Sequence, residues 1–117
     1  MAAPNVVNVA TITGKTGVQA VGTSATAIVS NSAGSGKVIK VNALLVSNVE
    51  NTTAYTITAD IFRSSTAYRF ATAISIPANS TLDIINKAIY LEEGDSLRLT
   101  ANSASKLEAV ASYEEIS

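Results

Sequence analysis

Two glycine–lysine pairs are the first residues of this chain whose spacing suggests chemistry. Gly14-Lys15-Thr16 ends like a phosphate-binding loop, but Val9 stands where that loop requires its first glycine. Gly34-Ser35-Gly36-Lys37 is followed by Val38, where a metal-binding Ser or Thr is needed. No helical periodicity follows either stretch, although a helix N-terminus must meet the phosphates. Both stretches are therefore predicted to be turns.

A short acidic stretch is a second candidate for chemistry. Glu92, Glu93 and Asp95 lie close together in the sequence, and hard cations such as Ca²⁺ prefer clustered carboxylate oxygens. Their spacing does not match an EF-hand loop. We interpret the stretch as an acidic hairpin turn that faces water.

Paired carboxylates for acid–base catalysis are a third candidate. An enzyme of this kind would need Asp60, Asp83 or Glu108 together in one cleft, but strand alternation places Asp60 and Asp83 opposite the hydrophobic faces, which predicts surface positions. The chain has no histidine and no cysteine, so the commonest general base and the commonest zinc ligands are missing. The sequence predicts no enzyme, with no catalytic, cofactor-binding or metal-binding residue.

Four tyrosines allow two interpretations. Tyr55, Tyr68, Tyr90 and Tyr113 could form a platform on which sugars stack, as in a carbohydrate-binding module. Tyrosines on strands more often bury the ring and keep the hydroxyl at the rim of the core. Aromatic residues make up only 5% of the chain, so we favour core and edge roles for these four.

Composition excludes several classes of protein. The 117 residues suit one domain. The net charge of −1 offers no basic stripe for nucleic acid, and no apolar run is long enough to span a membrane. The N-terminus lacks the pattern of a signal peptide, which predicts synthesis in a cytoplasm without secretion. Only 15% of the residues are charged, which favours a homo-oligomer or another assembly whose subunits cover much of the surface.

Alternating hydrophobic residues between turn-rich stretches predict an all-β chain. The expected fold is a single β-sandwich, jelly-roll or immunoglobulin-like, with about seven to nine short antiparallel strands. Residues 18–117 would form the sandwich, and residues 1–17 would be an N-terminal arm or an edge strand. The clearest strands are predicted at residues 38–46, 54–63, 67–76, 90–91, 97–99 and 107–113.

The predicted faces of these strands define the expected core. In 67–76 the residues Tyr68, Phe70, Thr72, Ile74 and Ile76 are expected to share one face. Strand 97–99 points Leu97 and Leu99 inward, and 107–113 does the same with Leu107, Ala109, Ala111 and Tyr113.

Strand 38–46 is apolar on both faces. Val41, Ala43 and Leu45 fall on one face, with Leu44 and Val46 on the other. Such a strand is central in its sheet or is covered by something outside that sheet.

The end of the chain has a predicted arrangement of its own. Residues 90–91 are expected to pair with 97–99 as a hairpin across the acidic turn. Residues 107–113 would close the sheet, and residues 114–117 would lie at a boundary or contact.

Four stretches in order carry a resemblance to a known group of proteins. They are the segments at residues 37–48, 76–82, 90–97 and 109–116, within a region of about residues 36–117. In these segments the chain resembles the small β-sandwich virion structural proteins of cyanophages and related tailed phages. The resemblance implies a virion protein without catalytic residues, assembled in the host cytoplasm.

Among virion parts, a capsid decoration (cement) protein fits the resemblance best. It would bind the major capsid protein or other virion proteins and stabilise the assembled head. A neck, tail or baseplate component is the alternative within the virion, and a carbohydrate-binding β-sandwich module is the alternative from another class.

Overall fold

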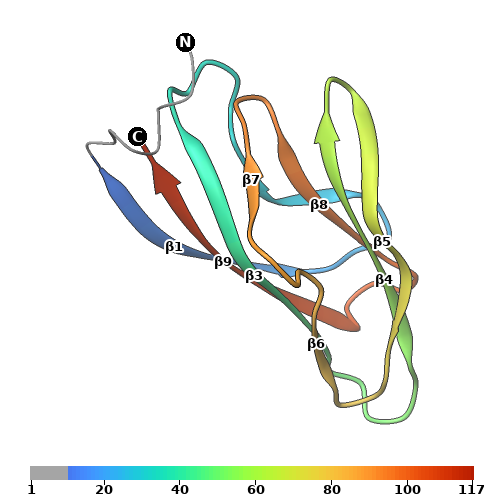
Figure 1. The fold of residues 1–117 in the computed structure, drawn as a ribbon. Coiled ribbons are helices and arrows are strands. Elements are labelled where there is room, and N and C mark those ends of the chain that lie inside the picture. Colours follow the sequence, from blue (N-terminus) through green and yellow to red (C-terminus); the bar gives the residue numbers. More distant parts are fainter. Residues whose placement is uncertain (1–10) are drawn as a thin grey trace.

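The computed structural model describes residues 11–117, which form two facing layers of β-strands and no helix (Figure 1). This confirms the predicted all-β sandwich, and it agrees with the many β-branched residues of the chain. The described strands are β1 (Ile12–Ala20), β2 (Thr26–Ser30), β3 (Val38–Asn48), β4 (Tyr55–Arg63), β5 (Thr66–Ile76), β6 (Thr81–Asp83), β7 (Ile89–Leu91), β8 (Ser96–Ala101) and β9 (Leu107–Ile116).

The strand order is that of a jelly roll. Sheet A has the order β1-β9-β3-β6, with β7 also paired to β3, and sheet B has the order β2-β8-β4-β5. Every strand pair in both sheets is antiparallel. Apart from β4–β5 and β6–β7, each connection passes from one sheet to the other, so consecutive strands such as β1 and β2 do not share a sheet. Two antiparallel sheets whose consecutive strands alternate between the sheets in this order form a jelly roll rather than an immunoglobulin sandwich.

Alternate residues of each strand fill the space between the sheets. In β8 the inward residues are Leu97, Leu99 and Ala101, and all are buried as the alternation predicts. In β9 the predicted inward face is also confirmed, with Tyr113 packed against the core. The large hydrophobic side chains that are almost fully buried are Val21, Ile39, Val41, Leu44, Val46, Ile57, Ile76, Leu91, Leu97, Leu99 and Leu107.

A bulge in β3 changes the predicted faces of that strand. The strand is central in sheet A, as expected, but its pairing with β9 shifts register between Val41 and Ala43. The extra residue reverses the alternation. Val41 and Leu44 are therefore both buried in the core, whereas Leu45 is exposed on the outer face of sheet A.

The predicted core face of β5 is wrong except at Ile76. Tyr68, Phe70 and Ile74 are exposed, and the buried residues of this strand are Ala71 and Ile76. β5 is the edge strand of sheet B, and its pairing with β4 shifts register at two places. These shifts change which side chains point between the sheets, so simple alternation fails along β5.

The end of the chain differs from the expected hairpin. β7 belongs to sheet A and β8 to sheet B, so residues 90–91 and 97–99 do not pair, and the acidic turn carries the chain between the sheets. β9 lies between β1 and β3 instead of closing an edge, and it continues to Ile116, which is buried.

β1 lies at an edge of sheet A and pairs with β9 from Ile12 to Ala20. It therefore runs without a break through position 17, where the sequence suggested a boundary between arm and domain. The part of that segment at residues 1–10 lies outside the described residues.

The bulge in β3 can be tested by its effect on two adjacent leucines. We expect Leu44→Ala to lower the free energy of unfolding by about 2–5 kcal/mol, because it leaves a cavity in the core. Leu45→Ala should change it by about 0.5 kcal/mol or less, because the side chain is exposed. Urea denaturation followed by circular dichroism measures both values. Equal losses in the two variants would contradict the observed register.

Candidate interaction surfaces

The two glycine–lysine stretches have different structures, and neither is a phosphate loop. Gly14-Lys15-Thr16 lies inside β1, so the predicted turn is wrong there. Gly34-Ser35-Gly36-Lys37 lies in the connection between β2 and β3, with positive φ at both glycines. The backbone N–H of Gly36 donates to the carboxylate of Glu93 (2.8 Å). The carboxylate of Glu93 therefore already accepts the hydrogen bond from a backbone N–H that a bound phosphate would need.

The acidic turn is a clamp on an arginine rather than a water-facing cluster. Asp95 is only 2% exposed, and it accepts hydrogen bonds from Nε and Nη2 of Arg63 (2.8 and 2.5 Å) and from the backbone of Glu92. Glu92 is exposed and accepts a further bond from Arg63 (2.9 Å). The hydrogen bonds from Arg63 hold the pKa of Asp95 below its ordinary value, although burial opposes this. Asp95 in turn raises the pKa of Arg63.

The three carboxylates considered for acid–base chemistry are divided between the two sheets. Asp60 is buried, which corrects the predicted surface position. Arg98, its cross-strand partner in sheet B, covers it with two hydrogen bonds (2.9 and 3.4 Å) and lies 4.1 Å from the ring centre of Phe62. Asp83 is exposed at the end of β6, as predicted, and Glu108 is exposed on β9; both belong to sheet A. The described residues 11–117 hold no cluster of three metal-ligating side chains.

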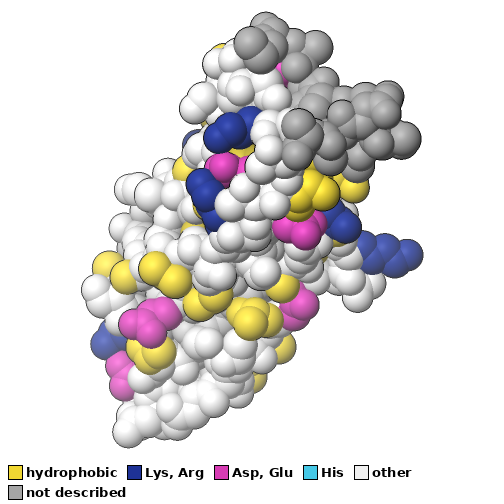
Figure 2. Space-filling model, turned by 90° about the vertical axis from the view of Figure 1, so that its left-hand side faces the viewer, with side chains coloured by type: hydrophobic (Ala, Val, Ile, Leu, Met, Phe, Trp, Pro, Cys, Tyr) yellow, Lys and Arg dark blue, Asp and Glu magenta, His cyan; other side chains and the backbone are white. Residues whose placement is uncertain are grey.

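A row of exposed hydrophobic side chains crosses three strands of sheet A. Val18, Val110 and Leu45 are direct cross-strand partners on β1, β9 and β3. Their exposed fractions are 75%, 39% and 40%. A shallow depression of about 340 Å³ lies beside this row, along β1 and β9. Seen from the side on which β1 lies, the surface is mostly uncharged, with hydrophobic side chains crossing it and charges in isolated spots (Figure 2).

This surface carries its charges at its borders. Asp83, the cross-strand partner of Leu45, ends the hydrophobic row on the edge strand β6, and the other charges lie in the flanking rows. The next row toward the chain termini is Thr16–Ser112–Ala43, which is uncharged. The flanking rows are Ala20–Glu108–Ser47 on one side and Gly14–Glu114–Lys40 on the other. We call these four rows the sheet A face. An uncharged centre with a charged rim is the usual composition of a protein–protein interface.

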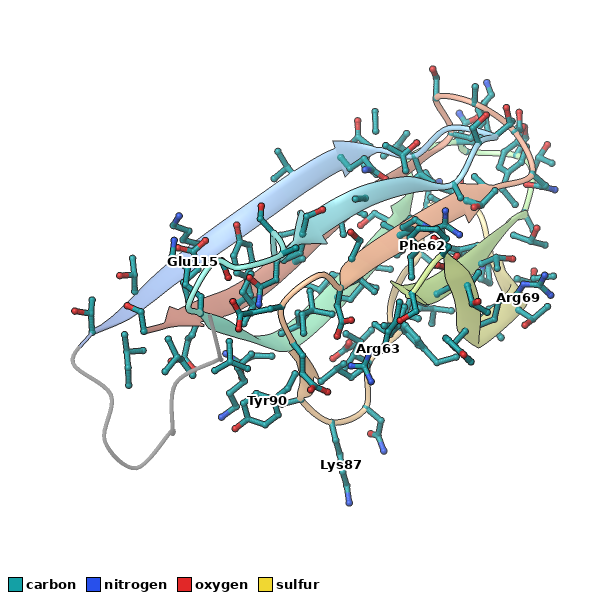
Figure 3. The ribbon with its side chains drawn as sticks, turned by 90° about the horizontal axis from the view of Figure 1, so that it is seen from above. Phe62, Arg63, Arg69, Lys87, Tyr90 and Glu115 are labelled. Carbon is teal, nitrogen blue, oxygen red and sulfur yellow. The ribbon has the colours of Figure 1, made fainter. Side chains whose placement is uncertain are left out.

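A second surface feature opens between the two sheets. A groove of about 360 Å³ is lined by Ile61, Arg63 and Tyr68 from sheet B and by Ile89 and Tyr90 from sheet A. We call it the tyrosine groove. Figure 3 shows Arg63 and Tyr90 on the same side of the molecule, with Lys87 projecting away from it.

The four tyrosines thus have two kinds of position. Tyr55 and Tyr113 pack against the core, as the sequence favoured. Tyr68 and Tyr90 are 59% and 45% exposed, and both line the groove. Sequence reasoning missed the groove because its residues come from strands whose pairing is not visible in the sequence. The ion pair of Arg63 was also missed, because its partner Asp95 is 32 residues away in the sequence.

Comparison with known proteins adds no family to this description. No protein-family model matches the chain, and no curated protein is significantly similar to it. Within residues 11–117 no helix is present that could cross a membrane. The functional argument therefore rests on the residues and their arrangement.

The clamp between Arg63 and Asp95 predicts a loss of stability in acid. The pKa of Asp95 is lower in the folded than in the unfolded chain, so its contribution is complete above the unfolded pKa of about 4 and is lost as pH falls through the folded pKa. We expect Asp95→Asn to lower the free energy of unfolding at pH 7 by about 1–3 kcal/mol. It should also flatten the decline of stability below about pH 4. Urea denaturation between pH 7 and pH 2 measures both effects.

Glu92→Gln is the matched control for this test. Glu92 bonds the same arginine but is exposed, and surface ion pairs contribute about 0–1 kcal/mol. A loss as large as that of Asp95→Asn, or an unchanged acid profile in Asp95→Asn, would contradict the clamp.

Proposed function

We propose that this protein is a structural component of a phage virion that binds other protein subunits through the sheet A face. The observation that carries the proposal is the exposed row Val18–Val110–Leu45, in register across three neighbouring strands. Hydrophobic side chains aligned across neighbouring strands are costly to leave in water, and contiguous exposed apolar patches mark interaction sites. A flat partner surface would remove all three from water at once.

The edge of sheet A offers a second mode of contact beside this face. Among residues 11–117, β1 is an edge strand, and the described part of the chain adds no further strand on its outer side. A strand from a partner or from a second copy of the chain can add to such an edge. This supports a homo-oligomer, or docking along a row of identical subunits.

A capsid decoration protein is the form of this function that we favour. The resemblance to small cyanophage virion proteins supports it, and jelly rolls occur in viral capsid domains, although they occur in lectins as well. The fold enters only as an analogy, since one fold serves many functions. Weak contacts suffice for this role, because a protein that binds only the assembled shell stabilises it by mass action over many copies. A neck, tail or baseplate position would use the same surface.

The proposal is tested by co-sedimentation of the purified protein with phage heads that lack it, with tails as the comparison. We expect saturable binding to heads and a higher temperature of head disruption. Val110→Glu should weaken head binding at least tenfold, because it buries a charge in the centre of the sheet A face. Val49→Glu is the matched control, because Val49 is an exposed valine in the loop after β3 and outside that face.

Each outcome has a definite meaning. Binding to tails or necks alone would replace the decoration role by the alternative position in the virion. Equal losses in Val110→Glu and Val49→Glu, or binding to no virion part, would reject the sheet A face as the docking surface.

A further inference from the structure

We propose that the tyrosine groove is a binding site for a neutral saccharide. It shares no residue with the sheet A face, which it borders where Tyr90 pairs with Lys40, and the inference does not depend on the proposed function. The groove of about 360 Å³ falls in the range of small-ligand sites, which is roughly 300–1,000 Å³. Its residues combine exposed aromatic rings, an aliphatic floor and a fixed group of hydrogen-bond donors.

The two tyrosines supply the stacking surfaces. Tyr68 lies on β5 and Tyr90 on β7, so the rings come from opposite sheets and border one groove. A pyranose ring has an apolar face made of C–H groups, and this face packs against the negative face of an aromatic ring. Ile61 and Ile89 line the groove beside them. Exposed tyrosines border a groove with few polar groups, which suits a flat ring with hydroxyls at its edge.

Arg63 supplies directed hydrogen bonds. Its Nε and Nη2 are held by Asp95 and Glu92, so the guanidinium plane cannot turn freely. Among residues 11–117 no group accepts a hydrogen bond from its Nη1, and Arg63 lines the groove. A rigid planar donor pair of this kind fits two neighbouring sugar hydroxyls.

The charge of the site favours a neutral ligand over an acidic one. The positive charge of Arg63 is compensated by the buried carboxylate of Asp95, and Glu92 adds a further negative charge beside it. An anionic sugar would therefore meet a guanidinium that is already neutralised and a nearby exposed carboxylate. Neutral hydroxyls lose nothing from that arrangement, because they need donors and acceptors rather than net charge.

The experiment is a titration of the whole chain with defined sugars. Maltotriose, cellotriose and mannotriose are the neutral probes, and sialyllactose and trigalacturonate are the acidic comparisons. The chain contains no tryptophan and four tyrosines, of which Tyr68 and Tyr90 line the groove, so a change of tyrosine fluorescence that is lost in Tyr68→Ala or Tyr90→Ala reports on the groove, and saturation-transfer NMR gives an independent readout. We expect at least one neutral trisaccharide to bind with Kd of about 1 mM or tighter and both acidic sugars to bind more weakly.

Variants locate the site. Tyr68→Ala and Tyr90→Ala should each weaken binding about tenfold or more, and Arg63→Lys should weaken it while keeping the charge. Phe70→Ala is the matched control, because Phe70 is an exposed aromatic residue on the same strand as Tyr68 but does not line the groove. Thermal unfolding verifies that each variant is folded.

Three results would overturn the proposal. They are the absence of binding by all three neutral probes at about 10 mM, a loss in Phe70→Ala as large as in Tyr68→Ala, and tighter binding of the acidic sugars than of the neutral ones. Neutral binding that disappears with either tyrosine and persists in Phe70→Ala would establish the site.

Discussion

The passage of the chain from sheet to sheet is the constraint on which the rest of this structure depends. Most connections change sheets, so the backbone N–H and C=O groups of these connections pass over the ends of the apolar core. Each such buried group without a hydrogen-bond partner would lower the free energy of unfolding by about 1–3 kcal/mol. Buried asparagines supply partners. Asn31 donates to the carbonyls of Lys37 and Leu91 (2.9 and 3.0 Å), and Asn48 donates to those of Thr53 and Ile76 (both 2.9 Å).

The same constraint links the core to the tyrosine groove. The crossing from β7 to β8 contains Asp95, whose backbone carbonyl accepts from Asn31 (2.8 Å) and whose side chain holds Arg63 at the end of β4. The residue that fixes the crossing therefore also fixes the donor group that lines the groove. In the proposed site Arg63 is held in place before any ligand arrives, because moving it would break its two hydrogen bonds to the buried Asp95.

How much the sequence predicts depends on the range of the interactions involved. The faces of β8 and β9 follow from alternation. Alternation fails in β3 and β5, because bulges shift its phase and depend on the partner strand. The burial of Asp60 was missed because its partner Arg98 is 38 residues away. The row through Val110 could not be predicted, since it requires β9 to lie between β1 and β3.

The two outer faces of the sandwich differ in a way that bears on the proposed function. Across sheet B the cross-strand row Arg69–Asp60–Arg98 carries three charges, and Arg98 also lies over an aromatic ring. Across sheet A the equivalent row is Val18–Val110–Leu45–Asp83, which is apolar on β1, β9 and β3 and carries its charge on the edge strand β6. Sheet B also exposes large hydrophobic side chains, Tyr68, Phe70 and Ile74, but these lie along its edge strand β5 and not across its central strands. The proposed docking on the sheet A face agrees with this arrangement, because interface centres exclude charge and their rims retain it.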